Sequence, residues 1–368
     1  MAPPIPYTQA DFAHSPFVVF YEVTRACDLL CKHCRACAQT RRHPQELTSQ
    51  QSQTLISQIA DFPKRPVLVF TGGDPMKRED IFTLIRHAVN VGLQAAMTPS
   101  ATPLVTTEAV RGLQEAGLSR LALSLDAADA ATHDAFRGVP GSFARTMEIL
   151  ADARAIGLPL QINTTITQRN VHQVEAMAEM LSSLGIVLWS VFFLIPVGRG
   201  RAEQRIAPEQ YEEVFAQLWE QAQRQPYAIK TTEAHHYRRF VLQRQGDPQR
   251  QPGGSLPGRI QRAPIGVNDG KGVMFISHTG SIYPSGFLPI RCGKFPAESV
   301  QQVYQESPLF QALRDPDRLK GKCGDCEYRA ICSGSRARAY GVTGDPLAAE
   351  PDCVYIPQAW KERALCSV

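Results

Sequence analysis

Apolar residues in the first half of the chain follow two alternating patterns. Short apolar runs such as residues 17–21 and 67–70 are typical of buried strands. Between them, apolar residues recur at helical spacing, as in Leu55, Ile56 and Ile59. Further strands are predicted to start near Gln94, Leu121, Leu160 and Val187. The alternation predicts six successive βα units.

The ends of the helices carry recognisable signals. Thr48 followed by Gln51 predicts a capping box at the start of the first helix. Glycines that allow a left-handed helix end are expected to close four helices, at Gly92, Gly117, Gly157 and Gly185. Strands that alternate with helices pair in parallel through right-handed crossovers, which suits a partial barrel or an open doubly wound sheet. We expect an α/β fold with a partial (β/α)6 TIM-like barrel, whose chemistry lies at the carboxyl ends of the strands.

Composition changes along the chain and suggests its organisation. Residues 243–262 are rich in Gln, Pro, Gly and Arg, which is typical of a loop or linker. Beyond them, residues 273–277 and 281–284 flank a turn with glycine and predict a β-hairpin. We expect four parts: an N-terminal arm (1–16), the barrel (17–230), a flexible linker or lid (231–265) and a small C-terminal cysteine-rich iron–sulfur domain (266–368).

Charge and hydropathy exclude some classes of function. The net charge is +4, from 39 basic and 35 acidic side chains, which is too mild to predict nucleic-acid binding and leaves room for an acidic small substrate. No signal peptide pattern opens the chain, and the longest apolar run, residues 186–197, is too short to cross a bilayer. We therefore expect a cytoplasmic protein without a nucleic-acid or membrane partner.

Seven of the ten cysteines fall into two clusters, which favours metal ligation over disulfides in a reducing compartment. Cys27, Cys31 and Cys34 follow the first strand with C-x3-C-x2-C spacing. Three thiolates can hold three irons of a [4Fe–4S] cluster and leave the fourth iron open. A zinc site is the alternative, completed by His33, Cys37 or His43. A fourth iron bound by Cys37 would instead indicate an electron carrier.

The cysteine motif, together with Gly72-Gly73-Asp74-Pro75 after the second strand, resembles the radical S-adenosylmethionine (SAM) superfamily. The resemblance implies that the three cysteines ligate a [4Fe–4S] cluster whose open iron is chelated by SAM. It also implies that Gly72, Gly73 and Asp74 contact the SAM amino group. Members of the family usually carry Glu where Asp74 stands, so the acidic partner is one methylene shorter here.

The same resemblance assigns further SAM contacts at later strand ends. Ser124 and Arg137 would hold the SAM carboxylate, and Asn163 would hold the ribose. Backbone near Leu194 and Pro196 would contact the adenine. Alternative roles are a salt bridge at a helix end for Arg137 and a strand-end turn for Asn163.

The second cysteine cluster resembles the SPASM extension of radical SAM enzymes, and its members are Cys323, Cys326, Cys332 and Cys353. Four thiolates would fully ligate one auxiliary [4Fe–4S] cluster. SPASM proteins with two auxiliary clusters have further cysteines where this chain has Ser285 and Ser333 or Ser335. We therefore expect a single auxiliary cluster, with Cys292 and Cys366 as spare thiols, and a zinc ribbon is the alternative.

Two segments, residues 21–27 and 333–346, resemble the superfamily branch that contains alternative haem synthase and the nitrite-reductase haem maturase. This branch implies an anionic tetrapyrrole substrate, whose carboxylates would pair with arginines such as Arg336, Arg338, Arg291 or Arg199. The alternative for Arg336 and Arg338 is a salt bridge that supports the cluster loop. His235 and His236 could ligate a substrate iron, although adjacent histidines more often face solvent.

The resemblance predicts an enzyme that reductively cleaves SAM to a 5′-deoxyadenosyl radical. Its reaction would be decarboxylation of tetrapyrrole propionates or another side-chain oxidation, with the auxiliary cluster taking up an electron. A SPASM-type maturase of a peptide substrate is the alternative within this chemistry. A non-enzymatic iron–sulfur or zinc protein is the alternative from another class. An external electron donor such as flavodoxin or ferredoxin is implied for the enzyme.

Overall fold

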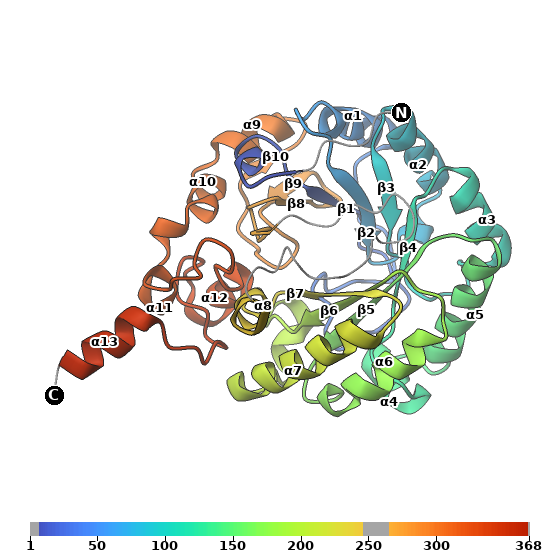
Figure 1. Cartoon of the computed structure of the whole chain (residues 1–368). Coiled ribbons are helices and arrows are strands. Elements are labelled where there is room, and N and C mark those ends of the chain that lie inside the picture. Colours follow the sequence, from blue (N-terminus) through green and yellow to red (C-terminus); the bar gives the residue numbers. More distant parts are fainter. Residues whose placement is uncertain (1–6, 246–264, 367–368) are drawn as a thin grey trace.

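A computed structural model describes residues 7–245 and 265–366. A curved sheet lies at its centre, with helices packed around the outside (Figure 1). The last part of the chain, drawn in orange and red, lies along one side of the sheet. The molecule therefore has the architecture of a barrel with a C-terminal extension beside it.

The barrel contains one parallel strand more than the periodicity predicted. Its consecutive parallel strands are β1 (Val18–Thr24), β2 (Val67–Gly72), β3 (Gln94–Met97), β4 (Arg120–Ser124), β5 (Leu160–Ile166), β6 (Leu188–Phe193) and β7 (Ala228–Thr232). The sequence analysis missed β7 because its five residues hold only one large apolar side chain, Ile229, and none of them is fully buried. The first six strands begin within one residue of the predicted positions.

The predicted hairpin extends the barrel sheet. Strand β8 (Val273–Ile276) pairs in parallel with β1, and β9 (Ser281–Tyr283) pairs antiparallel with β8. The two-residue β10 (Gly293–Lys294) completes a sheet of order β10-β9-β8-β1-β2-β3-β4-β5-β6-β7. Strands β8 to β10, which lie in the region predicted as the C-terminal domain, thus belong to the same sheet as the barrel strands.

The crossover helices form as the end signals predicted. Helix α1 (Ser49–Ala60) starts with a complete capping box between Thr48 and Gln51. The four predicted helix-ending glycines all have positive φ, between 69° and 92°. The other barrel helices are α2 (Ile81–Asn90), α3 (Thr107–Glu115), α4 (Ala130–Arg137), α5 (Ser142–Ala155), α6 (Val174–Ser182) and α7 (Pro208–Arg224). Short 3-10 turns are η1 (Ala10–Ala13), η2 (Pro75–Lys77), η3 (Val171–Gln173) and η4 (Gly198–Ala202).

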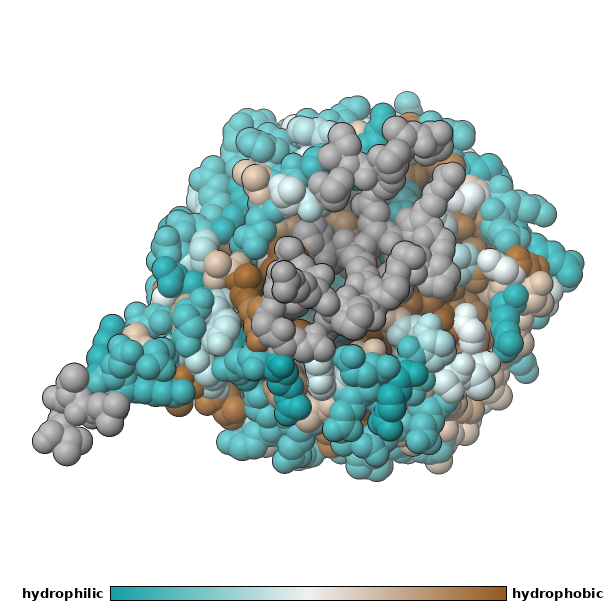
Figure 2. Space-filling model, in the orientation of Figure 1, coloured by the Kyte–Doolittle hydropathy of each residue, from teal (hydrophilic) through white to brown (hydrophobic). Residues whose placement is uncertain are grey.

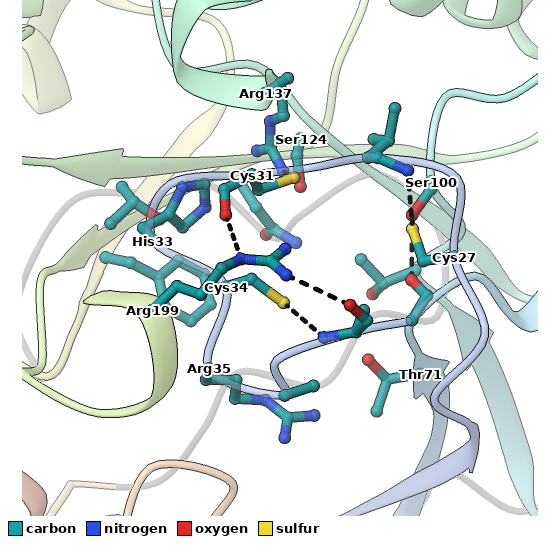
Figure 3. A pocket seen from close by; sticks show the side chains of 18 of the residues that line it. Cys27, Cys31, His33, Cys34, Arg35, Thr71, Ser100, Ser124, Arg137 and Arg199 are labelled. Atoms are coloured by element: carbon teal, nitrogen blue, oxygen red, sulfur yellow. Dashed lines mark hydrogen bonds between the residues drawn. The ribbon is translucent and has the colours of Figure 1, made fainter. Parts of the chain in front are cut away.

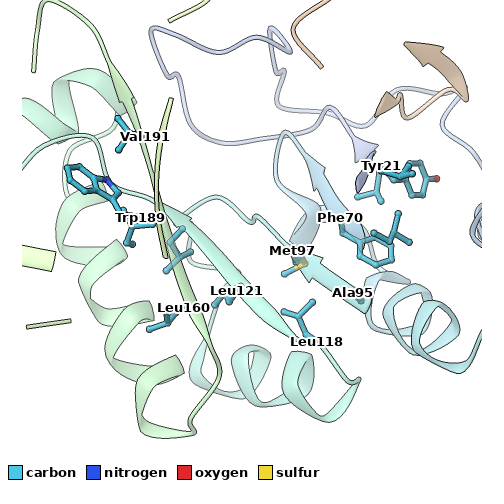
Figure 4. Close-up of a cluster of buried hydrophobic side chains, with 14 of the residues drawn as sticks. Tyr21, Phe70, Ala95, Met97, Leu118, Leu121, Leu160, Trp189 and Val191 are labelled. Atoms are coloured by element: carbon cyan, nitrogen blue, oxygen red, sulfur yellow. The ribbon is translucent and has the colours of Figure 1, made fainter. Parts of the chain in front are cut away.

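The main hydrophobic core lies between the sheet and the helices that surround it (Figure 4). Trp189 of β6 is fully buried there, and its indole N–H donates to the Thr164 hydroxyl at 2.8 Å. Tyr21 of β1 is also fully buried and shares a hydrogen bond of 2.7 Å with Ser52 of α1. The polar groups of these two buried aromatic side chains are thus satisfied.

Part of the predicted linker is an ordered helix. Helix α8 (Tyr237–Gln245) packs on α7, with Tyr237, Phe240 and Val241 in the main core. The remainder of the predicted linker, residues 246–264, lies outside the described residues. The helices that follow are α9 (Val300–Glu306), α10 (Pro308–Arg314), α11 (Gly321–Gly324), α12 (Arg336–Thr343) and α13 (Gln358–Cys366), with the turn η6 (Pro316–Arg318).

Within the predicted N-terminal arm, η1 buries Phe12 against Phe17 and Val267. On the face shown in Figure 2, most residues at the rim are hydrophilic, and apolar residues lie nearer the centre. Among the helices of the described residues, none is both long and apolar enough to cross a membrane.

Candidate functional site

The loop that carries Cys27, Cys31 and Cys34 follows β1 and is held by the loop after β2. The backbone N–H of Gly73 donates to Thr24 at 2.8 Å, and that of Asp74 donates to Ala26 at 2.7 Å. A Cβ on Gly73 would lie 2.4 Å from the Ala26 carbonyl oxygen. Only glycine allows this close approach of the two backbones, so the Gly-Gly pair positions the start of the cysteine loop.

The end of α4 and the segment after β6 hold the remainder of the loop. The backbone N–H of Leu30 donates to the Arg137 carbonyl oxygen at 3.1 Å, and that of Lys32 donates to the Phe136 carbonyl oxygen at 2.9 Å. After β6, Arg199 donates its backbone N–H to Cys34 at 3.0 Å. Its side chain donates to the carbonyl oxygens of Cys31 and Ala38. The cysteine loop is therefore held by the loop after β2, the end of α4 and the segment after β6.

The three cysteines line one cavity at the carboxyl ends of the strands, shown in Figure 3. The cavity has an empty volume of about 1150 Å³, including its open mouth. Each sulfur has a hydrogen-bonding neighbour: Cys27 accepts the Leu29 N–H at 3.4 Å, and Cys34 accepts the Ala38 N–H at 3.5 Å. Cys31 lies 3.7 Å from a nitrogen of Arg137. Such donors stabilise thiolates, so the site has the ligand chemistry that a [4Fe–4S] cluster needs.

The cavity brings together six of the eight residues predicted to contact SAM. These are Gly72, Gly73, Ser124, Arg137, Asn163 and Leu194. Ser124 and Asn163 are direct neighbours in the register of β4 and β5. Pro196 does not line the cavity, whereas Ile195 beside it does. The predicted strand ends therefore converge as the βα pattern implied.

Asp74 is the second predicted residue that does not line the cavity. Its side chain is fully buried, and its carboxylate accepts hydrogen bonds from the Thr102 hydroxyl at 2.7 Å and from the backbone N–H groups of Met76 and Ser100. Burial raises its pKa. The short side chain thus ties the loop after β2 to the loop after β3.

Arg137 joins the cysteine loop to β4. One guanidinium nitrogen lies 2.5 Å from the carboxylate of Asp126, and the other approaches Cys31. Burial raises the pKa of the Cys31 thiol, and the Arg137 charge opposes that rise. His33 stacks on Phe136 with ring centroids 4.3 Å apart, and burial holds its pKa well below the usual value.

Arg35 is a cavity residue that the sequence analysis missed. One Nη nitrogen pairs with Glu22 of β1 at 3.2 Å, and the guanidinium lies 4.4 Å from the centre of the Phe275 ring. A Cβ on Gly286 would lie 3.0 Å from the Arg35 Nε, so this glycine makes room for the guanidinium. His278 binds the other Glu22 oxygen at 2.7 Å. A basic residue directly after the third cysteine was the available sequence signal.

The lining of the cavity has an uneven charge. Among the described residues it includes three arginines, Arg35, Arg137 and Arg199, and no aspartate or glutamate. It also includes Phe192 and Phe287, whose rings lie 6.2 Å apart. Figure 3 shows Arg137 and Arg199 near the cysteines and Arg35 on the cysteine loop itself. The cavity therefore suits an anionic molecule with apolar surfaces.

A second pocket, of about 410 Å³, contains all four cysteines of the C-terminal cluster: Cys323, Cys326, Cys332 and Cys353. The sulfur of Cys323 accepts the Glu350 N–H at 3.2 Å. Cys332 accepts the Gly334 N–H at 3.4 Å. The other two accept the N–H of the residue two positions later, Tyr328 and Tyr355. Four sulfurs that each accept a backbone N–H fit a fully ligated iron–sulfur cluster.

His235 and His236 are buried, unlike the solvent-facing pair that the sequence favoured. His236 lines the four-cysteine pocket together with Arg239, while His235 does not. Burial lowers the pKa of His236 to about 3. The end of β7 and the start of α8, which the sequence analysis assigned to a linker, therefore form one wall of this pocket.

Two arginines considered for substrate contact hold the protein together. Arg338 is fully buried and pairs with Glu350 and Asp352 at 3.1 Å. Arg336 is also fully buried and donates to the carbonyl oxygens of Pro346 and Ala348. Neither lines the first cavity, and Arg291 is exposed outside it. Of the four arginines considered for substrate contact, only Arg199 lines the first cavity.

The serines that stand in place of further cysteines belong to a buried polar group. Ser335 donates to the carboxylate of Glu233, and its own backbone N–H donates to Glu350. Asp269 accepts the Ala337 N–H at 2.9 Å and interacts with both Ser285 and Glu233. Burial raises the pKa of Glu233 well above its usual value. This group joins the end of β7 to the start of α12.

Cys37 and Cys292 line neither pocket. Cys37 is exposed, and Cys292 packs beside the main core with its thiol donating to the Ile290 carbonyl oxygen at 3.6 Å. Within residues 7–245 and 265–366, no group of three or more His, Cys, Asp or Glu side chains is arranged to hold a single metal ion. The two pockets thus contain seven of the cysteines.

Comparison with known proteins identifies related sequences. A model of the Radical SAM superfamily matches residues 21–181. An AdoMet-dependent heme synthase of Nitratidesulfovibrio vulgaris is 38% identical over 358 residues, which cover 96% of each chain. Its counterpart in Methanosarcina barkeri is 36% identical and covers 94% of this chain and 98% of the relative. A PqqA peptide cyclase of Bradyrhizobium diazoefficiens is 26% identical and covers 93% of this chain and 87% of the relative.

The fold also matches a solved structure. SuiB of Streptococcus suis, in a crystal structure bound to S-adenosylmethionine, superposes with a TM-score of 0.69 at 18% identity. The match covers 93% of this chain and 78% of SuiB. The barrel and the C-terminal extension therefore recur together in a protein of distant sequence.

Proposed function

The chain belongs to the radical SAM superfamily, and we propose that it removes carboxyl groups from the propionate arms of an iron tetrapyrrole. As a radical SAM enzyme it uses a [4Fe–4S] cluster and SAM. The choice of substrate is supported by two relatives named AdoMet-dependent heme synthase, which align over nearly the whole chain.

The observation that carries this proposal is the charge of the first cavity. Three arginines line it, and no carboxylate among the described residues does. Arg35 and Arg137 are paired with Glu22 and Asp126 behind the lining, whereas the Arg199 side chain donates only to backbone carbonyl oxygens. One carboxylate belongs to SAM itself, and the charge of Arg199 is left for a second anionic molecule. Arg35 and Arg199 suit the substrate propionates, since a guanidinium binds a carboxylate through two parallel hydrogen bonds. Phe192 and Phe287 offer aromatic faces to a flat macrocycle.

In this proposal, one set of cavity residues binds the first cluster and another set binds SAM. Cys27, Cys31 and Cys34 ligate the first cluster. The residues that contact SAM are Gly72, Gly73, Ser124, Arg137, Asn163 and Leu194. Asp74 acts through its neighbours by holding the loop that presents Gly73, and Pro196 shapes the backbone at Ile195. When bound, the clusters and SAM supply a 5′-deoxyadenosyl radical that takes up a hydrogen atom, and a centre that takes up one electron.

Conversion of a propionate arm to a vinyl group requires the chain to position the arm. The β carbon of a propionate arm loses a hydrogen atom, the bond to the carboxylate breaks, and a vinyl group, carbon dioxide and one electron result. Arg35 and Arg199 orient the carboxylate so that the β carbon faces the cysteine loop. The apolar walls limit water access to the reacting carbon.

The second pocket is proposed to hold one auxiliary [4Fe–4S] cluster through Cys323, Cys326, Cys332 and Cys353. Because four thiolates occupy all four irons, this cluster would exchange electrons and not bind substrate. Arg239 and Lys322 line the pocket, and their charge favours uptake of an electron by a group ligated by four thiolates. An external donor such as flavodoxin or ferredoxin would supply the first electron. A reducing cytoplasm would keep the thiols available for ligation.

The test is anaerobic incubation of the reconstituted enzyme with iron-coproporphyrin III, SAM and a reductant, followed by mass spectrometry. We expect stepwise loss of carbon dioxide and two hydrogens from each reacting propionate. Deuterium placed at the propionate β carbon should appear in 5′-deoxyadenosine. A Cys27→Ala variant serves as the control without SAM cleavage. Release of 5′-deoxyadenosine with neither a mass change nor an optical shift of the porphyrin would contradict the proposed substrate.

A peptide substrate is the second candidate. The observation that favours it is the similarity to a PqqA peptide cyclase over most of both chains. Its lower identity, 26% against 38%, makes it the weaker candidate. Loss of two hydrogens from a supplied precursor peptide, with the porphyrin unchanged in the same assay, would select it.

A further inference from the structure

The turn between β7 and α8 places a histidine against the four-cysteine pocket. His236 immediately precedes α8 and lines this pocket with all four cysteines. Its side chain is 1% exposed. The rings of Tyr211 and Phe215 lie 5.1 and 4.8 Å from the imidazole. The imidazole thus packs against aromatic side chains, and His236 shares the lining of the pocket with the four cysteines.

The imidazole of His236 has no hydrogen-bond partner in the part of the chain that the structure describes. Neither Nδ1 nor Nε2 makes a hydrogen bond to any residue of the described ranges, 7–245 and 265–366. A neutral imidazole has one N–H donor and one lone pair. A buried donor without an acceptor costs about 1–3 kcal/mol, so a ring in this position is expected to have a partner in the pocket.

The chemistry of the pocket limits what that partner can be. Four cysteines fill the four iron positions of a cubane cluster, so the imidazole lone pair finds no open iron. The pocket is also lined by the cations Arg239 and Lys322, which cannot accept a hydrogen bond. Glu350 lines it too, but its carboxylate already accepts from the Arg338 side chain and from the backbone N–H groups of Ser335 and Asp352. Sulfur atoms of the cluster are acceptors, and they carry the negative charge that reduction adds. The imidazole N–H of His236 can therefore donate a hydrogen bond to a sulfur of the cluster, whereas its lone pair has no iron to bind.

We propose that His236 donates an N–H hydrogen bond to a sulfur of the auxiliary cluster and makes this cluster easier to reduce. The physical reason is that a donor aimed at sulfur stabilises the more negative, reduced state. This inference rests on the proposed ligation of the auxiliary cluster by the four cysteines and is independent of the identity of the substrate.

The neighbouring residue provides a matched control. His235 is also buried, at 9% exposure, and also has an unpartnered Nδ1 among the described residues, but it does not line the cysteine pocket. A substitution at His235 therefore removes a buried imidazole from the same turn without removing a contact to the cluster.

The first measurement is the midpoint potential of the auxiliary cluster, from redox titration monitored by electron paramagnetic resonance in the full-length reconstituted protein. We expect His236→Phe to shift the reduction equilibrium about tenfold toward the oxidised cluster, which is about 59 mV for one electron. Iron content should stay the same, and His235→Phe should leave the potential in place. His236→Gln retains an N–H donor, so its potential should lie between those of the wild type and His236→Phe. An unchanged potential in His236→Phe would overturn the proposal.

A second measurement does not depend on how the variants fold. Pulsed electron paramagnetic resonance of the wild-type protein, with histidine labelled by ¹⁵N, should show one weakly coupled nitrogen at the reduced auxiliary cluster. Absence of a coupled nitrogen, or a strong coupling typical of a directly bound ligand, would contradict the hydrogen bond. A wild-type protein that assembles only the first cluster would instead contradict the proposed function of the second pocket.

Discussion

Arg137 of α4 and Asp126, which follows β4, form a buried ion pair with an N–O distance of 2.5 Å. Asp126 is itself anchored, because one oxygen accepts the Thr165 N–H at 2.8 Å. The pair lies beside Cys31, to which Arg137 also points. The sequence analysis considered SAM binding and a helix-end salt bridge as alternatives for Arg137, and the salt bridge is present while the residue also lines the cavity.

Removing one partner of this pair should destabilise the protein. We expect Asp126→Asn to lower the free energy of unfolding by about 3 kcal/mol, because it leaves the Arg137 charge buried and unpaired. Thermal unfolding of the reconstituted protein measures the effect. Glu148→Gln, which breaks the more exposed pair with Arg145, is the control and should change stability by about 0.5 kcal/mol or less. Equal midpoints for Asp126→Asn and the control would show that the pair contributes nothing.

Gly73→Ala should prevent cluster assembly. The new Cβ would lie 2.4 Å from the Ala26 carbonyl oxygen and 2.7 Å from that of Arg25, and backbone atoms cannot move aside as side chains do. Gly157→Ala is the matched control: nothing lies within 4 Å of its added Cβ, and only the cost of a positive φ, about 1 kcal/mol, applies. Iron analysis and the optical spectrum after reconstitution measure the outcome. Full iron content in Gly73→Ala would mean that the loop has another way to accommodate the methyl group.

Arg35→Gln should weaken substrate binding by about tenfold or more, because a charge-assisted hydrogen bond contributes about 1.5–3 kcal/mol. Optical titration with iron-coproporphyrin III measures the affinity. Arg291→Gln is the control, since Arg291 is exposed and outside the cavity. Release of 5′-deoxyadenosine without substrate should be the same in both variants. Equal porphyrin affinity in both variants would remove Arg35 from the proposed site.

Stability should depend on pH through His133. Burial and the nearby Arg137 lower its pKa from 6.5 to about 4 in the folded protein. Between pH 6.5 and 4 the unfolded chain binds a proton that the folded protein does not, so the contribution is complete above pH 6.5 and is lost as the pH falls. The loss amounts to roughly 3 kcal/mol across this window.

The measurement for His133 is the unfolding free energy at several pH values between 7 and 4. Asparagine cannot titrate, so the unfolding free energy of His133→Asn should fall less on acidification than that of the wild type, by roughly 3 kcal/mol. His172→Asn, at an exposed position, is the control and should follow the wild type. Parallel pH profiles for all three proteins would contradict the assignment.

Iron content should separate the ligating cysteines from the others. The wild type is expected to bind about eight irons, as two cubane clusters. Cys332→Ser should reduce this to about four, because serine is a poor ligand for iron in such clusters. Cys292→Ser and Cys37→Ser should have no effect, since both thiols lie outside the two pockets. A loss of iron in either control would add that cysteine to the ligand set.

Local patterns were sufficient to predict much of the barrel. The capping box at Thr48, the positive φ of Gly92 and the starts of the first six strands depend on neighbours within a few positions, and all agree with the structure. Strand β7 was missed because Ile229 is the one large apolar side chain among its five residues, and its place in the sheet comes from pairing with β6. A strand without an alternating or continuous run of apolar residues gives no periodic signal in the sequence.

The sequence by itself determined the two sets of cysteines, the glycines that let backbones meet, and the superfamily to which the chain belongs. Only the tertiary structure decided which charged groups face each site. Arg35 is held by Glu22 and Phe275, the latter 240 positions away from it along the chain, and Asp74 turns away from the cavity to bind Thr102. His236 meets Cys323 and Cys353 only because the end of β7 packs against the C-terminal region. Such contacts join segments that are remote in sequence, so no local spacing could encode them.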